Sequence, residues 1–389
     1  MKQSTDRILV THTGSLPRPA DLVPLLFQPP TEDFYARVRE AVASAVRRQV
    51  EAGVDVVSDG EQGRPGFHLY AHSRLSGFVI HHETTPWMPR DVADHPVLQQ
   101  KLFGSGGAQG VPLVTCEGPI AMADPQAIYR DIATFREALA GHTYADAFLT
   151  AASPGVIAST FSNRYYPDRE AYVQALARAM AQDYRAIVEA GFVLQVDSPD
   201  LAMDRQLQFA DAPLPAFREH VEQSIRALNA ALSGIPPERV RVHVCHGNYP
   251  GGHQRDVALA DILDLLLTVR AQGLSIVAAN SQHRTTTFQA IQHLVETQGW
   301  PSDKILIPGV IDTLSPVEEH AETVAELLER YASLVGPEHV LAGTDCGFGT
   351  IVGVFENLVP SAVWDRLRAL SAGAKLASQR LWPQQAGAR

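Results

Sequence analysis

Short apolar runs alternate with longer amphipathic stretches along the 389 residues of the chain. The short runs are typical of buried parallel strands, and a stretch such as 32–52, with apolar residues at near-helical spacing, is typical of a helix packed on a sheet. We therefore predict eight strands, at residues 8–10, 54–58, 147–150, 192–196, 241–245, 274–277, 305–307 and 339–342. Helices are predicted between them, at about 32–52, 168–190, 217–232, 262–269, 317–334 and 364–378.

This alternation predicts an α/β fold, a (β/α)8 TIM barrel formed by residues 1–389 as a single domain. A doubly wound open sheet is the alternative, but no Gly-x-Gly-x-x-Gly follows the first predicted strand. Residues 62–125 are rich in His, Pro and Gly and too long for a simple connection. We expect them to form an inserted hairpin or lid after the second strand.

The composition is that of a globular protein, with 45% hydrophobic and 19% charged residues. No apolar run approaches the roughly 18 residues of a membrane span, and no signal peptide is visible. A net charge of −11 argues against nucleic acid or a membrane surface as partner. Three cysteines make no disulfide framework, which favours a reducing, cytoplasmic location, and Cys116 is expected to be structural. Homo-oligomerisation is plausible for a barrel of this size.

A histidine and a cysteine, His243 and Cys245, stand near the end of the fifth predicted strand. A strand points residues i and i+2 to the same face, so both side chains emerge side by side. Cys346 follows the eighth predicted strand at the corresponding end. His243 or Cys245 alone would more often be a buried core side chain. One imidazole and two thiolates together suit Zn²⁺ with one position open, and so wide a split along the chain is more typical of a catalytic site.

Other polar side chains also fall at the carboxyl ends of predicted strands, where a barrel carries its chemistry. Asp59, Glu61 and Asp197 could hold a cationic group such as an ammonium, or could form ion pairs with Arg18, Arg64 or Arg164. Ser15 follows a glycine in a turn and could donate to a carboxylate or cap that turn. The remaining polar residues at these ends are Asn280 and Asp312.

Seven short motifs carry a resemblance that runs in order over nearly the whole chain. They are Thr13-Gly14-Ser15-Leu16-Pro17-Arg18-Pro19, Asp59-Gly60-Glu61, Ser153-Pro154-Gly155, Gln195-Val196-Asp197, His243-Val244-Cys245, Pro308-Gly309-Val310-Ile311-Asp312 and Asp345-Cys346-Gly347. In these motifs the chain resembles the catalytic barrel of cobalamin-independent methionine synthase, without the N-terminal half of that enzyme. It also resembles the epoxyalkane:coenzyme M transferase branch, which joins a zinc-bound thiol to an epoxide.

The resemblance implies zinc on His243, Cys245 and Cys346 and a small-molecule thiol substrate. It also implies that Ser15, Glu61 and Asp197 occupy the positions that hold the carboxylate and amino groups of homocysteine in methionine synthases. Two positions depart from the family pattern. Val277 stands where those enzymes have a glutamate zinc ligand, and Leu314 stands where they have a histidine.

His283 or Asn280 could compensate for these departures. We therefore predict a zinc-dependent thiol alkyltransferase of the methyl-transferring type, with an alkyl donor as second substrate. An epoxide–thiol transferase or C–S lyase, a hydrolase or lyase using zinc-bound water, and a non-catalytic binder are the alternatives. The predicted site residues are Asp312 and His283 for catalysis, Ser15, Asp59, Glu61, Asp197, Asn248 and Asn280 for substrate binding, and His243, Cys245 and Cys346 for the metal.

Overall fold

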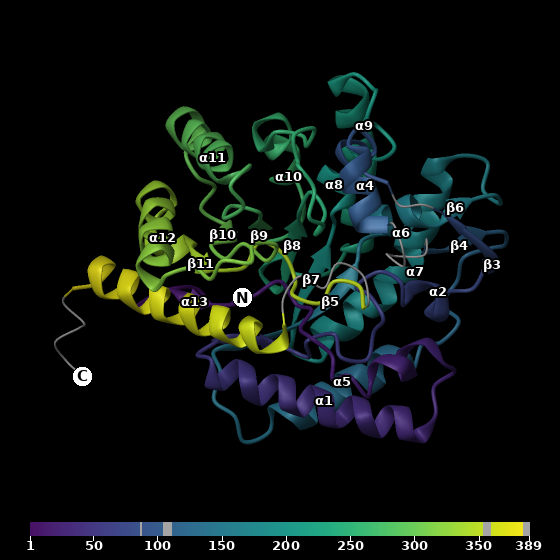
Figure 1. Ribbon diagram of the computed structural model, residues 1–389, viewed down its shortest axis with the longest axis horizontal. Coiled ribbons are helices and arrows are strands. Elements are labelled where there is room, and N and C mark those ends of the chain that lie inside the picture. The colour runs from purple at the N-terminus through teal and green to yellow at the C-terminus, as the bar shows by residue number, and fades with distance from the viewer. Residues whose placement is uncertain (86–87, 104–110, 353–358, 384–389) are drawn as a thin grey trace.

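The computed structural model describes residues 1–85, 88–103, 111–352 and 359–383. One sheet holds six parallel strands in the order β10-β9-β8-β7-β5-β2, and a second holds β1 and β11 (Figure 1). The bounds of these strands are β1 Leu9–Val10, β2 Val56–Ser58, β5 Asp146–Ala152, β7 Val193–Asp197, β8 Val240–Val244, β9 Gly273–Ile276, β10 Ile305–Pro308 and β11 Leu341–Ala342.

Backbone contacts join the two sheets into a closed ring. Asp55 N donates to Val10 O at 2.9 Å, which links β1 to the start of β2. On the other side, a parallel bridge pairs Leu306 with Val340 and links β10 to β11. The predicted (β/α)8 barrel is therefore confirmed, and each predicted strand coincides with an observed one.

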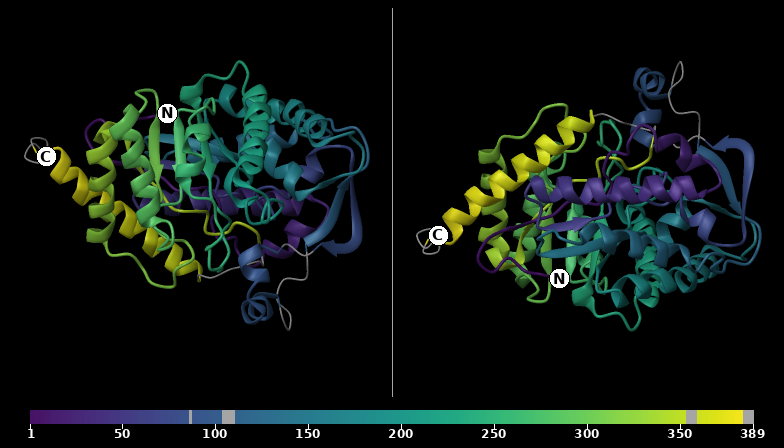
Figure 2. Two further views of the ribbon diagram at one scale, coloured as in Figure 1. Left: turned by 90° about the horizontal axis from the view of Figure 1, so that it is seen from above. Right: turned by 90° about the horizontal axis from the view of Figure 1, so that it is seen from below.

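Helices cover the outside of the barrel, as the views along two further directions show (Figure 2). Thr31 and Asp168 begin α1 and α7 by accepting hydrogen bonds from backbone N–H groups of the first turn. None of the described helices combines the length and apolar character that a bilayer crossing requires. The helix bounds are η1 Val23–Phe27, α1 Glu32–Glu51, α5 Ala127–Leu139, α6 Pro154–Thr160, α7 Arg169–Glu189, α8 Asp200–Met203, α9 Leu214–Ala231, η2 Pro237–Arg239, α11 Arg284–Gln298, α12 Ala321–Val335, η4 Pro337–His339 and α13 Pro360–Leu381.

The connection between β8 and β9 differs from the predicted helix over 262–269. The structure has only η3 (Leu259–Asp261) and α10 (Leu263–Leu266) there. A loop rich in glycine and proline, residues 246–258, occupies the first part of the connection. Glycine and proline are poor helix formers, so this loop adds no helical residues to the connection, and the α-helix that follows it is limited to one turn.

A small third sheet lies to one side of the barrel (Figure 1). In it β3 (Phe78–Thr85) pairs antiparallel with β4 (Val111–Cys116), which pairs in parallel with β6 (Ser162–Asn163). The same stretch carries α2 (Ala71–Arg74), α3 (Arg90–Ala93) and α4 (Pro96–Phe103). Within the predicted insertion 62–125, residues 86–87 and 104–110 lie outside the described part of the chain, and its role as a lid stays a prediction.

A buried arginine occupies the barrel interior on β8. Arg241 is 1% exposed and donates to Gln195 Oε1 at 2.7 Å and to Thr11 Oγ1 at 2.9 Å. Its guanidinium carbon also lies 3.6 Å from the centroid of the Phe148 ring. An apolar cluster closes this part of the interior, formed by Leu9, Val56, Phe148, Val193, Ile305, Ile307 and Leu341.

We predict that Arg241→Met lowers the free energy of unfolding by about 2–4 kcal/mol, because it leaves buried oxygen acceptors without a donor. Urea unfolding monitored by circular dichroism measures the change. Arg226→Met is the matched control, since the side chain of Arg226 is 57% exposed, and we expect a change within about 0.5 kcal/mol. Equal effects of the two substitutions would contradict a structural role for Arg241.

Candidate metal centre at the barrel mouth

Three metal-ligating side chains converge at the carboxyl ends of β8 and β11. The ligand atoms of His243, Cys245 and Cys346 all lie within 4.8 Å of one another, and all three residues are buried. His243 and Cys245 share the inward face of β8 with Arg241, because alternate residues of a strand face the same way. The proximity expected from the sequence is therefore present in the structure.

The two thiols and the imidazole shift one another's pKa values. The pKa of Cys245 lies well below its usual value, first because Cys346 donates a hydrogen bond to its sulfur and further because His243 lies beside it. The same hydrogen bond raises the pKa of Cys346 well above its usual value. Burial alone would lower the pKa of His243, but the neighbouring Cys245 raises it. A thiolate stabilised in this way is a ligand that a soft divalent cation binds by displacing protons.

The side chain of Ser275 orients the imidazole. Its Oγ lies 3.3 Å from Nδ1 of His243, across the paired strands β8 and β9. With Nδ1 facing this hydroxyl, Nε2 is the nitrogen left for a metal, and such an outer hydrogen bond is typical of metal-binding histidines.

An aliphatic side chain stands beside the two thiols. Val277 forms a small buried cluster with Cys245 and Cys346. The Asp345 carboxylate fixes the segment that follows, accepting hydrogen bonds from the backbone of Ala278 at 2.7 Å and of Ala279 at 2.9 Å. Because Val277 offers no ligand atom, the ligand atoms of His243, Cys245 and Cys346 fit a zinc ion that is bound by three protein ligands.

Glu61 lies in the turn after β2, in a left-handed conformation with φ 56°. Its Oε1 accepts a hydrogen bond from Thr150 Oγ1 at 3.1 Å. Its Oε2 is buried without a hydrogen-bond partner in the described part of the chain, and the guanidinium of Arg18 is 3.7 Å away. Asp59 supports the turn by accepting from Glu61 N at 2.9 Å. Burial raises the pKa of the Glu61 carboxyl, so a cation at Oε2 would relieve an unfavourable state.

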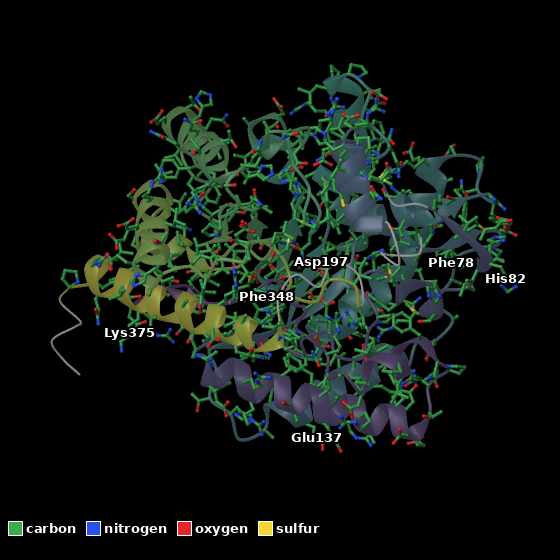
Figure 3. The ribbon with its side chains drawn as sticks, in the orientation of Figure 1. Phe78, His82, Glu137, Asp197, Phe348 and Lys375 are labelled. Atoms are coloured by element: carbon green, nitrogen blue, oxygen red, sulfur yellow. The ribbon has the colours of Figure 1, made fainter. Side chains whose placement is uncertain are left out.

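Asp197 is a second buried carboxylate at this mouth and lies in the middle of the molecule (Figure 3). Its Oδ1 accepts a hydrogen bond from Gln195 Nε2 at 2.7 Å. Burial, followed by the charge of Glu61, raises its pKa to about 8. A buried carboxylate whose pKa is raised by burial and by a neighbouring carboxylate is a place where a substrate ammonium would be stabilised.

Ser15 packs directly against the segment that carries Cys346. Its Oγ accepts a hydrogen bond from Gly349 N at 3.4 Å. A Cβ on Gly347 would lie only 1.9 Å from this Oγ, and a Cβ on Gly14 would lie 3.0 Å from Glu61 Oε1. The glycines of these motifs therefore let Ser15 approach the segment that carries Cys346, and let the turn at Gly14 approach Glu61.

Asn248 contacts protein groups with both ends of its amide. Nδ2 donates to Gly347 O at 2.9 Å and to Thr350 Oγ1 at 2.7 Å, and Oδ1 accepts from Thr313 Oγ1 at 3.1 Å. These bonds tie together the loops after β8, β10 and β11. The predicted substrate-binding role of Asn248 stays a prediction.

Asn280 and Asp312 also form local hydrogen bonds. Asn280 Oδ1 accepts from Gln282 N at 3.0 Å, and Asp312 Oδ1 accepts from Leu314 N at 2.9 Å. Both residues are half-buried. Their predicted roles in substrate binding and catalysis stay predictions.

His283 lies in a different cluster from the thiols. Its Nε2 is 2.7 Å from Asp256 Oδ2, and His246 completes a second group whose ligand atoms lie within 4.8 Å of one another. Burial alone would raise the pKa of the Asp256 carboxyl, but the charge of His246 and hydrogen bonds from His253 and His283 lower it. The sequence analysis missed His246 and Asp256, because they are brought to His283 by a loop without periodicity.

Comparisons with known proteins agree with the motif resemblance. No family model matches the chain. The methionine synthase of Pyrococcus furiosus is 26% identical over 342 residues, covering 86% of this chain and 84% of that protein. The methionine synthase of Saccharolobus solfataricus is 23% identical over 352 residues, covering 90% and 87%.

Solved structures agree on the fold. A B12-independent methionine synthase from Shewanella sp. W3-18-1, in complex with selenomethionine, superposes with a TM-score of 0.74 at 21% identity, covering 97% of this chain and 99% of that one. A putative B12-independent methionine synthase from Listeria monocytogenes gives a TM-score of 0.62 at 17% identity, covering 95% and 98%. Curated methionine synthases match the chain along most of its length and the B12-independent enzyme shares its fold, so the comparisons support the resemblance to the cobalamin-independent methionine synthase family.

Proposed function

We propose that this protein is a zinc-dependent transferase that joins an alkyl group, of the methyl type, to the sulfur of a small thiol. The observation that carries the proposal is the convergence of His243, Cys245 and Cys346 within 4.8 Å beside two buried carboxylates. The two curated relatives described above are named methionine synthases, and this supports homocysteine as the thiol.

Zinc bound at this centre would lower the pKa of an incoming thiol, so that a thiolate is present at neutral pH. In the transfer, a sulfur electron pair forms the new S–C bond, and the bond between the carbon and the donor's leaving atom breaks with its pair. The thiol proton is released before this step. Glu61 and Asp197 bind the substrate ammonium, Ser15 donates to its carboxylate, and together they orient the sulfur toward the metal ligands.

Val277 bears on which carbon donor is used. Two thiolates neutralise the charge of Zn²⁺, whereas a further carboxylate would make the centre anionic and a bound sulfur more electron-rich. A neutral centre favours a reactive electrophile over a poor methyl donor. This observation supports an epoxide–thiol transferase as the second candidate function.

We predict that Cys346→Ser removes one metal equivalent per chain and abolishes thiol-dependent turnover, because an alcohol is a far weaker zinc ligand than a thiolate. Metal analysis by mass spectrometry and the sulfur-to-metal charge-transfer absorption of the Co²⁺-substituted protein measure the loss. Cys116→Ser is the control, since Cys116 donates to Gly118 O instead. Retention of the charge-transfer band in Cys346→Ser would remove the proposed centre.

We predict that Asp197→Asn raises the Kd for homocysteine about 10- to 100-fold, which corresponds to roughly 1.4–2.7 kcal/mol of lost ammonium binding. Calorimetric titration of the zinc-loaded protein measures it. 4-Mercaptobutanoate, which is homocysteine without the amino group, should bind the variant and the native protein about equally. Asp200→Asn, a buried carboxylate held by Ser153, is the matched variant and should leave both affinities unchanged. If both thiols weaken equally in Asp197→Asn, the ammonium assignment is wrong.

We predict that Val277→Glu slows the loss of zinc to a chelator by about tenfold or more, or roughly 1.4 kcal/mol, because it adds a carboxylate ligand. It should also raise turnover with 5-methyltetrahydrofolate relative to turnover with an epoxide as the carbon donor. Val277→Gln controls for side-chain size without charge. Identical chelation rates in the Glu and Gln variants would show that this position does not govern the metal.

A further inference from the structure

A second group of potential metal ligands follows the thiol centre along the chain. His246 comes directly after Cys245, and its ligand nitrogen, an oxygen of Asp256 and a nitrogen of His283 all lie within 4.8 Å of one another. The side chains of His246, Asp256 and His283 are only 10%, 3% and 10% exposed. Neither the transferase proposal nor its mechanism uses this cluster.

The tautomer of His246 leaves a lone pair without a partner. Nε2 lies 3.1 Å from the carbonyl oxygen of Val257, so this nitrogen must carry the hydrogen and donate it. Nδ1 then bears the lone pair and is buried without a hydrogen-bond partner in the described part of the chain. The carboxylate oxygen Oδ2 of Asp256 lies 3.8 Å from it. Two acceptors thus face each other, which is unfavourable unless a cation lies between them.

The other two ligands are held in place for the same cation. The ring of His283 stacks on that of His246 with 4.1 Å between centroids and 3° between planes. Its Nε2 is 2.7 Å from Asp256 Oδ2, and His253 Nδ1 approaches the same oxygen at 3.0 Å. Gln206 donates to the other carboxylate oxygen, Oδ1. The contacts made by His253 and Gln206 are of the kind that orients metal ligands from outside the coordination sphere.

The donor set identifies the class of metal. Two imidazole nitrogens and one carboxylate oxygen suit zinc and other first-row divalent ions, whereas Ca²⁺ and Mg²⁺ prefer oxygen ligands alone. We propose that His246, Asp256 and His283 form a second, thiolate-free site for a divalent ion of the zinc class. The ion would fasten the loop 246–258 to the first turn of α11. This inference does not rest on the proposed transferase function.

The test uses the full chain with both cysteines of the first centre replaced, Cys245→Ser and Cys346→Ser, and Co²⁺ alone as the probe. We expect the native protein to bind two equivalents and the double variant one. The remaining equivalent should give ligand-field absorption without a sulfur charge-transfer band. Adding Asp256→Asn to the double variant should abolish Co²⁺ binding, whereas adding His293→Asn, an exposed histidine of α11, should not.

A double variant that binds no Co²⁺ while remaining folded by circular dichroism would overturn the second site. So would an undiminished equivalent after Asp256→Asn, because the ion would then be bound elsewhere. If Asp256→Asn does not fold, His283→Gln replaces it with the same expected loss. The proposal is also wrong if the native protein binds only one equivalent of Co²⁺ and the cysteine substitutions remove it. The cluster of His246, Asp256 and His283 would then hold a proton and no metal. Failure of the transferase proposal instead shows as missing turnover with both equivalents present.

Discussion

The arrangement of the barrel mouth depends on the alternation of side chains along β8 within a closed barrel. Because the ring is closed, the side chains on the inward face of this strand point into the barrel interior. Arg241, His243 and Cys245 share that face and form a column from the buried interior to the mouth. A shift of one residue in the pairing of β8 with β7 and β9 would turn all three outward. The cluster of candidate metal ligands and the polar interior are thus consequences of the same register.

Asp345 holds the opposite side of the mouth. Its two oxygens accept hydrogen bonds from three successive backbone N–H groups, those of Ala278, Ala279 and Asn280. These contacts bind the end of β9 to the segment that carries Cys346. The carboxylate therefore fixes two neighbours of Cys245 together, the second thiol and the apolar side chain of Val277. The Asp345 carboxylate thus places both a thiol that could bind a metal, Cys346, and an apolar side chain that could not, Val277.

Much of this arrangement could be predicted from the sequence, because it follows from periodicity and strand order. The strands, the shared face of His243 and Cys245, and the position of Cys346 at a matching strand end need no information beyond local pattern. The loop 246–258 has no such pattern, since its three glycines and one proline leave its path to tertiary contacts. The sequence therefore could not predict that this loop buries His246 against Asp256 and His283. It also could not predict that the Asn248 amide ties three loops together.

The central claim is that one cation is bound by an imidazole and two thiolates with a position left for a substrate sulfur. A crystal structure of the zinc-loaded protein with homocysteine, using anomalous scattering at the zinc edge, tests it most directly. The account predicts a zinc peak at bonding distance, about 2.0–2.3 Å, from His243, Cys245 and Cys346, with the homocysteine sulfur as the fourth ligand. Absence of a peak among these three residues, or a peak there whose fourth ligand is not the homocysteine sulfur, would contradict it.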